Sequence, residues 1–488
     1  MFRVFGGTTP LEVVERYSRT VGTTILPPEW AFSPWRWRDE VWNLPEFYDG
    51  TPNTSPFNSM VVEDILMMEA LGIPCAVYVI DRPWASGRLG YGDFQFDPQR
   101  FPNATEMIAW LRERGVMPVL WIGPWVLDDH RREAVSLGYH VRKRVPFPPQ
   151  AALIDFTHPE GQAWWQELLR LFLGMGVAGF KLDRGDEDVP DGLLLQGAYA
   201  DGTSYREGHN LYPLWFIQAA YGALPNPEGS VLLTRAGWAG TSSFGLTWGG
   251  DTAANEWGLR NSIIAVQRAA AMNFPIWGSD VGGYVGRPSR EVLARWLAFS
   301  AFTPLMLIGP MANLAPWSWA PDGVQAQVNA RGYGFVPFYD EELVAITIFY
   351  AGLHDDLRPY TYAQALAAHE QGTPIVRPLV FVYPKNEYVD VWETYLYGPD
   401  LLVRPVWEPG AESVKVHIPP GRWINLWTRE EVTGPTTVEV AVPRHVVPIF
   451  ARGGSPLAEL DLPGRWAAAQ ARARTRPNLG ALLQAAGW

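Results

Sequence analysis

From about residue 28 onward, the chain alternates short apolar runs with longer segments whose apolar residues recur every three to four positions. This alternation predicts a parallel β-sheet covered by helices, because a parallel connection needs a crossover that is usually helical. Eight candidate strands are present, and that number favours closure into a (β/α)8 barrel. We expect the strands at residues 30–34, 75–81, 117–122, 178–183, 231–235, 246–251, 274–280 and 304–308.

The segments between these strands carry the 3.6-residue period of amphipathic helices. Gly72, Gly115 and Gly176 follow the first three of them, at the position where helices commonly end. The predicted helices cover residues 59–71, 105–114, 159–175, 212–224, 255–272 and 289–299, with one more at 340–353 after the last strand.

After about residue 373 the pattern changes to short β-rich runs interrupted by glycine and proline, which predicts an appended antiparallel β-sandwich. The last stretch is rich in alanine and arginine and is typical of a loosely held helix. The expected domains are a lead-in at residues 1–27, the barrel at 28–372, the β-sandwich at 373–460 and a tail at 461–488.

The composition of the 488-residue chain, 47% hydrophobic and 18% charged, is that of a soluble globular protein. The net charge of −12 argues against nucleic acid or an anionic membrane as a partner, because both repel a negative surface. Neither a run of 18 apolar residues nor a basic leader is present, so we expect no membrane association and a cytoplasmic location. The sequence leaves open whether the protein forms a homo-oligomer.

We expect neither a cofactor nor a metal. The eight histidines are scattered, without the close His and carboxylate spacing of metal sites, which argues against a metal-dependent barrel hydrolase. The glycine pairs at 249–250 and 282–283 lack the downstream lysine of a nucleotide-binding loop. Cys75 is the single cysteine, so no intrachain disulfide can form.

Asp183 and Asp251 each end one of these apolar runs. The carboxyl ends of barrel strands form the rim where barrel enzymes carry out their chemistry. Retaining hydrolysis of a glycosidic bond needs two carboxyl groups across that bond, one as nucleophile and one as proton donor and acceptor. The 24 tryptophans agree with a sugar ligand, since flat aromatic rings stack on sugars, although most of them are expected in the core.

Three ordered motifs resemble those of glycoside hydrolase family 31, whose members include α-glucosidases and α-xylosidases. They cover residues 176–183, 240–251 and 277–284, and weaker matches extend the similarity over about residues 10–457. The resemblance implies that Asp183 is the nucleophile and Asp251 the general acid/base of a retaining α-glycosidase. The partner would then be a small-molecule or oligosaccharide substrate with a terminal, non-reducing α-linked sugar.

The resemblance also implies a set of substrate-binding residues. Asp81 matches a position that binds distal sugar hydroxyls, and Asp280 has either that role or a structural one. The full predicted binding set is Asp81, Trp121, Lys181, Trp248, Trp277, Asp280 and Tyr284.

The residues around the two aspartates agree with this division of roles. Lys181 lies two positions before Asp183 and therefore on the same face of the strand, and Arg184 follows it, so positive charge surrounds the nucleophile. Asp251 follows Trp248 and two glycines, and an apolar surround there would raise its pKa toward that of a proton donor. Arg235 is expected to pair with a carboxylate of the pocket.

Three departures from the family leave open which sugar the substrate carries. Ser243 stands where the family commonly has an arginine, and Leu307 and Gly309 stand where it has an arginine and a histidine. The family also generally carries a β-sandwich before the barrel, and few residues precede the first predicted strand. Glucosides, xylosides, galactosides and acidic α-glycosides all stay open, as do a transglycosylase and a catalytically impaired carbohydrate-binding relative.

Overall fold

The computed structural model describes residues 3–87, 89–90, 93–142, 150–186, 189–190, 196–324, 328–329 and 332–488. Eight parallel strands form one sheet in the order β10-β1-β2-β3-β6-β7-β8-β9, so the predicted barrel is confirmed. The strands are β1 (Trp35–Arg38), β2 (Val77–Ile80), β3 (Met117–Ile122), β6 (Gly179–Leu182), β7 (Val231–Thr234), β8 (Leu246–Trp248), β9 (Trp277–Gly278) and β10 (Leu307–Ile308).

The barrel closes between the last two strands. Val281 N donates to Leu307 O at 2.8 Å, and Asp280 pairs with Leu307 in a parallel bridge. All eight carboxyl ends therefore meet at one rim.

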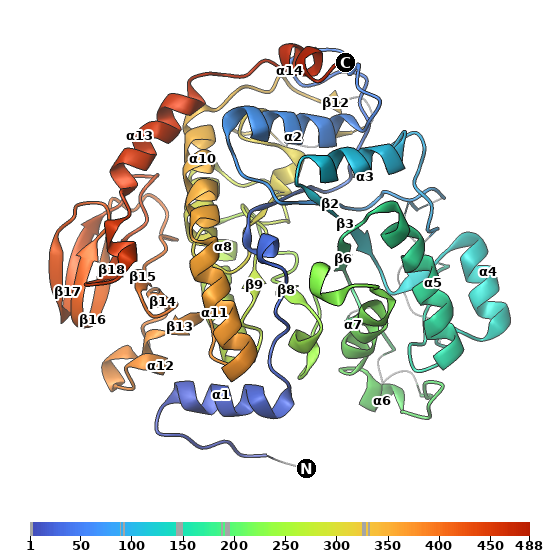
Figure 1. Ribbon diagram of the computed structural model, residues 1–488, viewed down its shortest axis with the longest axis horizontal. Coiled ribbons are helices and arrows are strands. Elements are labelled where there is room, and N and C mark those ends of the chain that lie inside the picture. Colours follow the sequence, from blue (N-terminus) through green and yellow to red (C-terminus); the bar gives the residue numbers. More distant parts are fainter. Residues whose placement is uncertain are drawn as a thin grey trace.

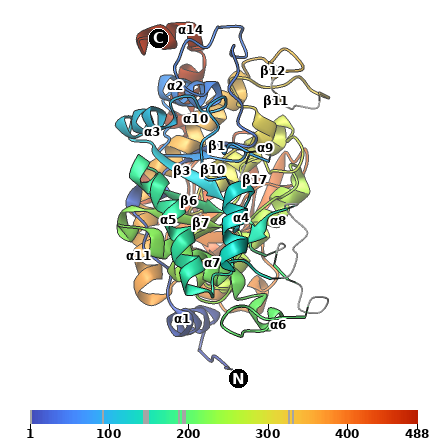
Figure 2. The same ribbon diagram turned by 90° about the vertical axis from the view of Figure 1, so that its right-hand side faces the viewer.

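Helices surround the barrel (Figures 1 and 2) and agree closely with the predicted segments. They are α2 (Ser59–Leu71), α3 (Ala104–Glu113), α5 (Pro159–Met175), α7 (Tyr212–Ala223), α8 (Glu256–Ala271), α9 (Arg290–Ser300), α10 (Glu341–Asp356) and α11 (Arg358–Gln371). The 3-10 turn η3 (Thr241–Ser243) connects β7 to β8. The connections also hold α1 (Pro10–Val21), η1 (Glu29–Phe32), β4 (Trp125–Val126), α4 (Asp128–Leu137), β5 (Ala152–Leu153), α6 (Tyr205–Gly208), β11 (Val328–Asn329) and β12 (Gly332–Tyr333).

The first strand lies further along the chain than its predicted position at residues 30–34. That segment contains the 3-10 turn η1, and β1 follows at Trp35–Arg38. Its pattern did not predict a buried strand because Arg36 and Arg38 alternate with its tryptophans. Both arginines are nevertheless buried, since they face Asp64 of α2.

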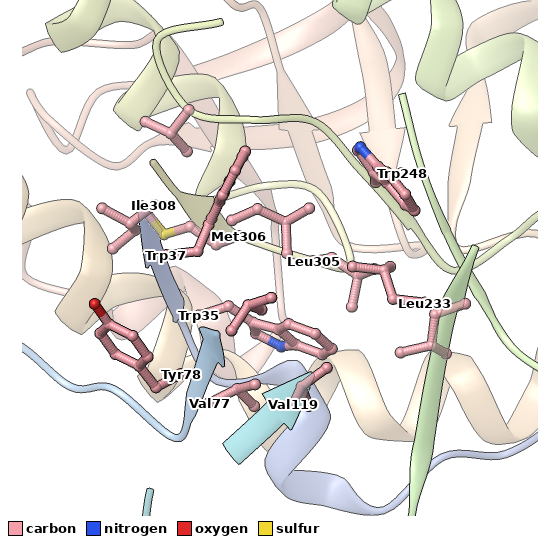
Figure 3. Close-up of a cluster of buried hydrophobic side chains, with 14 of the residues drawn as sticks. Trp35, Trp37, Val77, Tyr78, Val119, Leu233, Trp248, Leu305, Met306 and Ile308 are labelled. Carbon is pink, nitrogen blue, oxygen red and sulfur yellow. The ribbon is translucent and has the colours of Figure 1, made fainter. Parts of the chain in front are cut away.

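Alternation along the strands fills the interior of the barrel with apolar side chains. Trp35 of β1 lies beside Val77, Val119 and Leu233 of three other strands (Figure 3). Trp37, two residues after Trp35, points the same way but nearer the rim. The lower part of the barrel is thus a filled core, and only its carboxyl-terminal end is left for polar groups.

The predicted antiparallel strands after the barrel are also confirmed. They form one six-stranded sheet in the order β13-β14-β15-β18-β16-β17, beside α10 and α11 (Figure 1). The strands are β13 (Val376–Pro378), β14 (Tyr395–Tyr397), β15 (Leu401–Val403), β16 (Ser413–Asn425), β17 (Glu431–Ala441) and β18 (Ile449–Arg452), with the short helix α12 (Leu379–Val382) between β13 and β14.

The tail returns to the barrel as two helices, α13 (Leu462–Ala473) and α14 (Leu479–Ala485). Tyr339 Oη donates to Ala473 O at 2.7 Å, and the ring of Trp488 packs on Phe57 and Trp110. The tail is therefore held by apolar packing rather than loosely attached.

The buried ion cluster on the outer face of β1 yields a prediction about stability. Burial alone would raise the pKa of Asp64, but Arg36 and Arg38 lower it overall. Asp64→Asn removes the carboxylate charge between two buried guanidinium groups, and breaking such a cluster costs about 3–5 kcal/mol. We expect a lower urea midpoint, followed by tryptophan fluorescence.

The matched control is Glu431→Gln, which breaks the exposed Arg422–Glu431 pair and should cost less than about 1 kcal/mol. Equal midpoints for the two variants would show that Asp64 does not stabilise the barrel.

Candidate active site

Asp183 and Asp251 reach the same pocket from the ends of two strands. Asp183 follows β6, and its amide still donates to Ile122 O of β3 at 3.0 Å. Asp251 follows β8 after two glycines. A Cβ at Gly249 would lie 2.7 Å from the ring of Trp277, and Gly250 has a φ of +73°, so glycine is required to turn the chain here. Both carboxylates line the pocket.

Donors from three sides fix the carboxylate of Asp183. Trp121 Nε1 donates to Oδ2 at 2.9 Å, and Arg184 N donates to Oδ1 at 2.7 Å. Arg235 Nη1 lies 3.1 Å from the same Oδ1. The side chain is 15% exposed, so its orientation is set by the protein rather than by solvent.

One nitrogen of Arg235 connects the two aspartates. Its Nη1 lies 3.1 Å from Asp183 Oδ1 and 3.8 Å from Asp251 Oδ2, so these two oxygens are at most about 7 Å apart. Retaining glycosidases hold their carboxyl groups about 5–5.5 Å apart, a separation that this limit admits. The expected pairing of Arg235 with a pocket carboxylate is confirmed.

The surroundings of Asp251 differ from the apolar ones expected from its neighbours in sequence. Its side chain is 49% exposed and faces Arg235. Two glycines and a tryptophan in sequence do not exclude solvent, because the turn that they make lies at the open rim. Asp251 is therefore the more accessible of the two carboxylates.

A buried lysine lies at the bottom of the pocket. Lys181 Nζ lies 2.7 Å from Asp81 Oδ2, 3.7 Å from the ring centre of Trp37 and 5.0 Å from that of Trp248. Burial raises the pKa of Asp81 to about 6, although Lys181 opposes this rise. Burial lowers the pKa of Lys181, but the nearby carboxylates, Asp81 first, raise it overall.

Asp280 is buried at the junction of β9 and β10. Within the described residues, neither of its carboxyl oxygens has a hydrogen-bond partner. Burial raises its pKa well above the ordinary value, Lys181 opposes this, and the charges of Asp251 and Asp81 add to the rise. Asp280 is thus held in a setting that favours its protonated form.

The predicted aromatic residues divide into two groups. Trp121, Trp248 and Tyr284 line the pocket, as do Asp81, Lys181 and Asp280. Trp277 lies outside the set of described pocket-lining residues and borders a neighbouring groove behind Trp248. A substrate contact by Trp277 stays a prediction that this placement does not favour.

The pocket also contains residues that the sequence did not single out as binding residues: Trp37, Arg82, Trp125, Arg184 and Arg235. Trp37 has the strand period of Trp35, and Arg82 and Arg184 each follow a predicted site aspartate, so those signals were available. Trp125 carried none, because it lies in a connection. The cavity volume of the pocket is about 120 Å³, which is small for a ligand site.

Two family models match the chain. The glycosyl hydrolases family 31 TIM-barrel domain matches residues 24–339, and the glycosyl hydrolase family 31 C-terminal domain matches residues 372–457. The chain belongs to glycoside hydrolase family 31.

Individual relatives agree with the family assignment. The chain is 30% identical to a 1,3-alpha-isomaltosidase of Kribbella flavida, covering 91% of this chain and 63% of that protein. It is 27% identical to alpha-glucosidase 2 of Bacillus thermoamyloliquefaciens, over 94% of this chain and 57% of the relative. The chain therefore spans about three fifths of the length of these relatives.

A solved structure extends the comparison to three dimensions. The cycloalternan-degrading enzyme from Trueperella pyogenes, in complex with isomaltose, superposes with a TM-score of 0.75 at 26% identity. The match covers 91% of this chain and 65% of that one.

The positions where this family 31 chain departs from the family have other uses in the structure. Ser243 Oγ donates to Thr23 O at 2.8 Å and so holds the amino-terminal segment. Gly309 has a φ of +140°, and a Cβ there would lie 2.1 Å from Trp37 O, so this backbone admits no side chain. Neither position supplies a polar side chain to the pocket.

Among the residues that the structure describes, no group of three or more His, Cys, Asp or Glu side chains could hold a metal ion. None of the helices in this described part of the chain combines the length and apolar character needed to cross a bilayer.

The Lys181–Asp81 pair yields a prediction about protonation. Lys181→Met removes the cation that stabilises the Asp81 carboxylate, so the pKa of Asp81 should rise from about 6 to a higher value. A carboxyl group whose pKa is higher in the folded than in the unfolded protein lowers the free energy of unfolding as the pH rises from the unfolded-state pKa to the folded-state pKa. In the variant this loss of stability should continue to a higher pH, because the folded-state pKa of Asp81 is higher. Infrared titration of the protonated carboxyl band and unfolding midpoints at pH 5 and pH 8 measure the two effects.

Lys415→Met, which removes an exposed lysine of β16, is the control and should change neither quantity. An unaltered carboxyl titration in Lys181→Met would mean that the two side chains are not coupled.

Proposed function

We propose that the chain is a retaining α-glycosidase that removes a terminal, non-reducing α-linked sugar from an oligosaccharide. The observation that carries this proposal is the bridging of Asp183 and Asp251 by one nitrogen of Arg235, which limits the separation of their oxygens to about 7 Å. The names of the relatives, an α-glucosidase and a 1,3-α-isomaltosidase, support an α-linked substrate.

Exposure supports the assignment of roles. Asp183 is 15% exposed and fixed by three donors, which suits a nucleophile that must attack one carbon from one direction. Asp251 is 49% exposed, so water can reach its carboxyl group, as the second displacement requires. It is therefore the proposed proton donor and acceptor.

The reaction proceeds in two displacements. A carboxylate oxygen of Asp183 bonds to the anomeric carbon while the glycosidic bond breaks, and the leaving oxygen takes the proton of Asp251. Asp251 then removes a proton from water, the water oxygen bonds to the anomeric carbon, and the bond to Asp183 breaks. Two inversions give overall retention of the anomeric configuration.

Arg235 connects the protonation of the two residues. While Asp183 is charged, its negative charge raises the proton affinity of nearby Asp251, which is then an acid. Once Asp183 is esterified to the sugar, that charge is lost, while Arg235 keeps its ion pair with Asp186 and lies 3.8 Å from Asp251. The affinity of Asp251 for the proton falls, and it becomes a base for the second step.

The finer sequence-based predictions stay predictions: the domain boundaries, the cytoplasmic location, the homo-oligomer and the lack of a cofactor. Hydrolysis and transglycosylation share the first displacement and differ in whether water or a second sugar attacks the intermediate. The products formed with and without an added acceptor sugar distinguish them.

Substitution of the two aspartates tests the proposal. Asp183→Ala should abolish hydrolysis of aryl α-glycosides. Asp251→Ala should lose roughly 10²–10⁴-fold on substrates with poor leaving groups and much less on activated ones, because only the former need a proton donor. With activated substrates Asp251→Ala should accumulate a glycosyl ester on Asp183, detected by mass spectrometry, and NMR of the first wild-type product should show the α-anomer.

Asp390→Asn, on the exposed surface, is the control for handling and folding. Binding of oligosaccharides without hydrolysis of any α-glycoside would favour the impaired relative, and a β-anomeric first product would contradict retention.

A further inference from the structure

Three polar side chains form a network on the pocket wall that faces the catalytic pair. In the ring of eight strands, β7 with Arg235 lies between β6 and β8, and β1 lies directly opposite β7. Asp39 follows β1, Arg82 follows Asp81 at the end of β2, and Tyr284 follows β9. We call Asp39, Arg82 and Tyr284 the far-wall network.

The network holds each of its members in one orientation. Tyr284 Oη donates to Asp39 Oδ2 at 2.8 Å and accepts from Arg82 Nη2 at 2.9 Å. Its ring stacks on Trp37, with the ring centres 6.1 Å apart and the planes within 10°. Arg82 Nη2 also lies 3.6 Å from Asp39 Oδ1. Since Trp37 in turn lies under Lys181, the far-wall network is built onto the bottom of the pocket.

Arg82 lines the pocket, as Tyr284 does, and follows Asp81 directly in the chain; its side chain is 30% exposed. The two consecutive residues therefore present a donor and an acceptor side by side. Sugar hydroxyls need both, because each hydroxyl donates one hydrogen bond and accepts others. A sugar whose anomeric carbon lies between Asp183 and Asp251 would turn the opposite side of its ring toward this wall.

The charge on Arg82 indicates which kind of group it recognises. Asp39 already balances the guanidinium, so the ion pair as a whole brings no net charge to the wall. An anionic substituent on the sugar would meet the carboxylates of Asp81 and Asp183 without an uncompensated cation at this wall. A neutral hydroxyl gains the hydrogen bond without that repulsion.

We propose that Arg82, held in place by Asp39 and Tyr284, donates a hydrogen bond to a hydroxyl on the far side of the terminal sugar and so selects neutral sugars that carry it. This inference rests on the proposed function and specifies its substrate class. Arg82 is a specificity-determining residue, and Asp39 and Tyr284 are positioning residues.

The test crosses Arg82→Met with aryl α-glucosides that lack one hydroxyl, at carbon 3, 4 or 6, and with the α-xyloside. Wild type should lose about 10–100-fold in kcat/KM on the one analogue that lacks the partner hydroxyl. Arg82→Met should lose a similar factor in kcat/KM on the parent glucoside. On the analogue that lacks the partner hydroxyl, Arg82→Met and wild type should have similar kcat/KM values, because the hydrogen bond is absent in both cases. A purely structural role for Arg82 would instead reduce kcat/KM by one factor on every substrate.

Two further variants keep the test meaningful if Arg82→Met folds poorly. Tyr284→Phe keeps the ring on Trp37 and removes the hydroxyl that ties Arg82 to Asp39, and Asp39→Asn removes the balancing charge. Both variants should raise KM for the parent glucoside with little change in kcat. In both, the difference in kcat/KM between the parent glucoside and the deoxy analogue should be smaller than in wild type. Arg422→Met, at an exposed ion pair, is the matched arginine control.

A uniform loss in Arg82→Met over all analogues would overturn the inference, and so would faster wild-type hydrolysis of a uronate or sulfonate analogue than of the neutral glucoside. If wild type hydrolyses no α-glycoside, the proposed function fails instead. Calorimetry then measures the binding of glucose and of the deoxyglucoses to wild type and to Arg82→Met. If wild type binds glucose more tightly than one deoxyglucose and Arg82→Met binds the two equally, the inference is supported; if the variant keeps the same difference in affinity, the inference is overturned.

Discussion

The site depends on the closing of eight parallel strands into a ring. The hydrogen bond from Val281 N to Leu307 O joins the last two strands and so brings every strand end to one rim. Side chains 245 residues apart, Asp39 and Tyr284, come within 2.8 Å of each other because of it. The tryptophans and aliphatic residues below fill the barrel, so the polar groups gather in the shallow space above them.

Within that space, charge is balanced locally. Lys181 pairs with Asp81, Arg235 with Asp183, and Arg82 with Asp39, so each of these three cations has a carboxylate beside it. Burying an unpaired charge is costly, and pairing removes most of that cost. The carboxyl oxygens of Asp280 have no hydrogen-bond partner among the described residues, and burial raises the pKa of this group, which favours its protonated form.

The sequence was most informative where local chemistry decides the structure. Helices such as α2 and α5 agree with prediction residue for residue, because an amino-terminal cap and a terminal glycine mark their ends. Asp183 and Asp251 could be found because Asp183 directly follows an apolar run and Asp251 follows one after two glycines. The network of Asp39, Arg82 and Tyr284 could not, since it depends on which strand ends face each other. The position of β1 was missed for a similar reason: its arginines are buried only because Asp64, on another element, neutralises them.

The close packing around Gly309 limits which residues can occupy this position in the wall of the pocket. A Cβ at this position would lie 2.1 Å from the carbonyl oxygen of Trp37, whose indole contacts both Lys181 and Tyr284. A side chain at this position, including the histidine expected from family resemblance, would clash with the backbone carbonyl of Trp37 and would require the end of β1 to move. A substitution at residue 309 that changes the sugar preference therefore becomes possible only after other substitutions have moved the backbone. The order in which mutations occur in such a lineage thus matters.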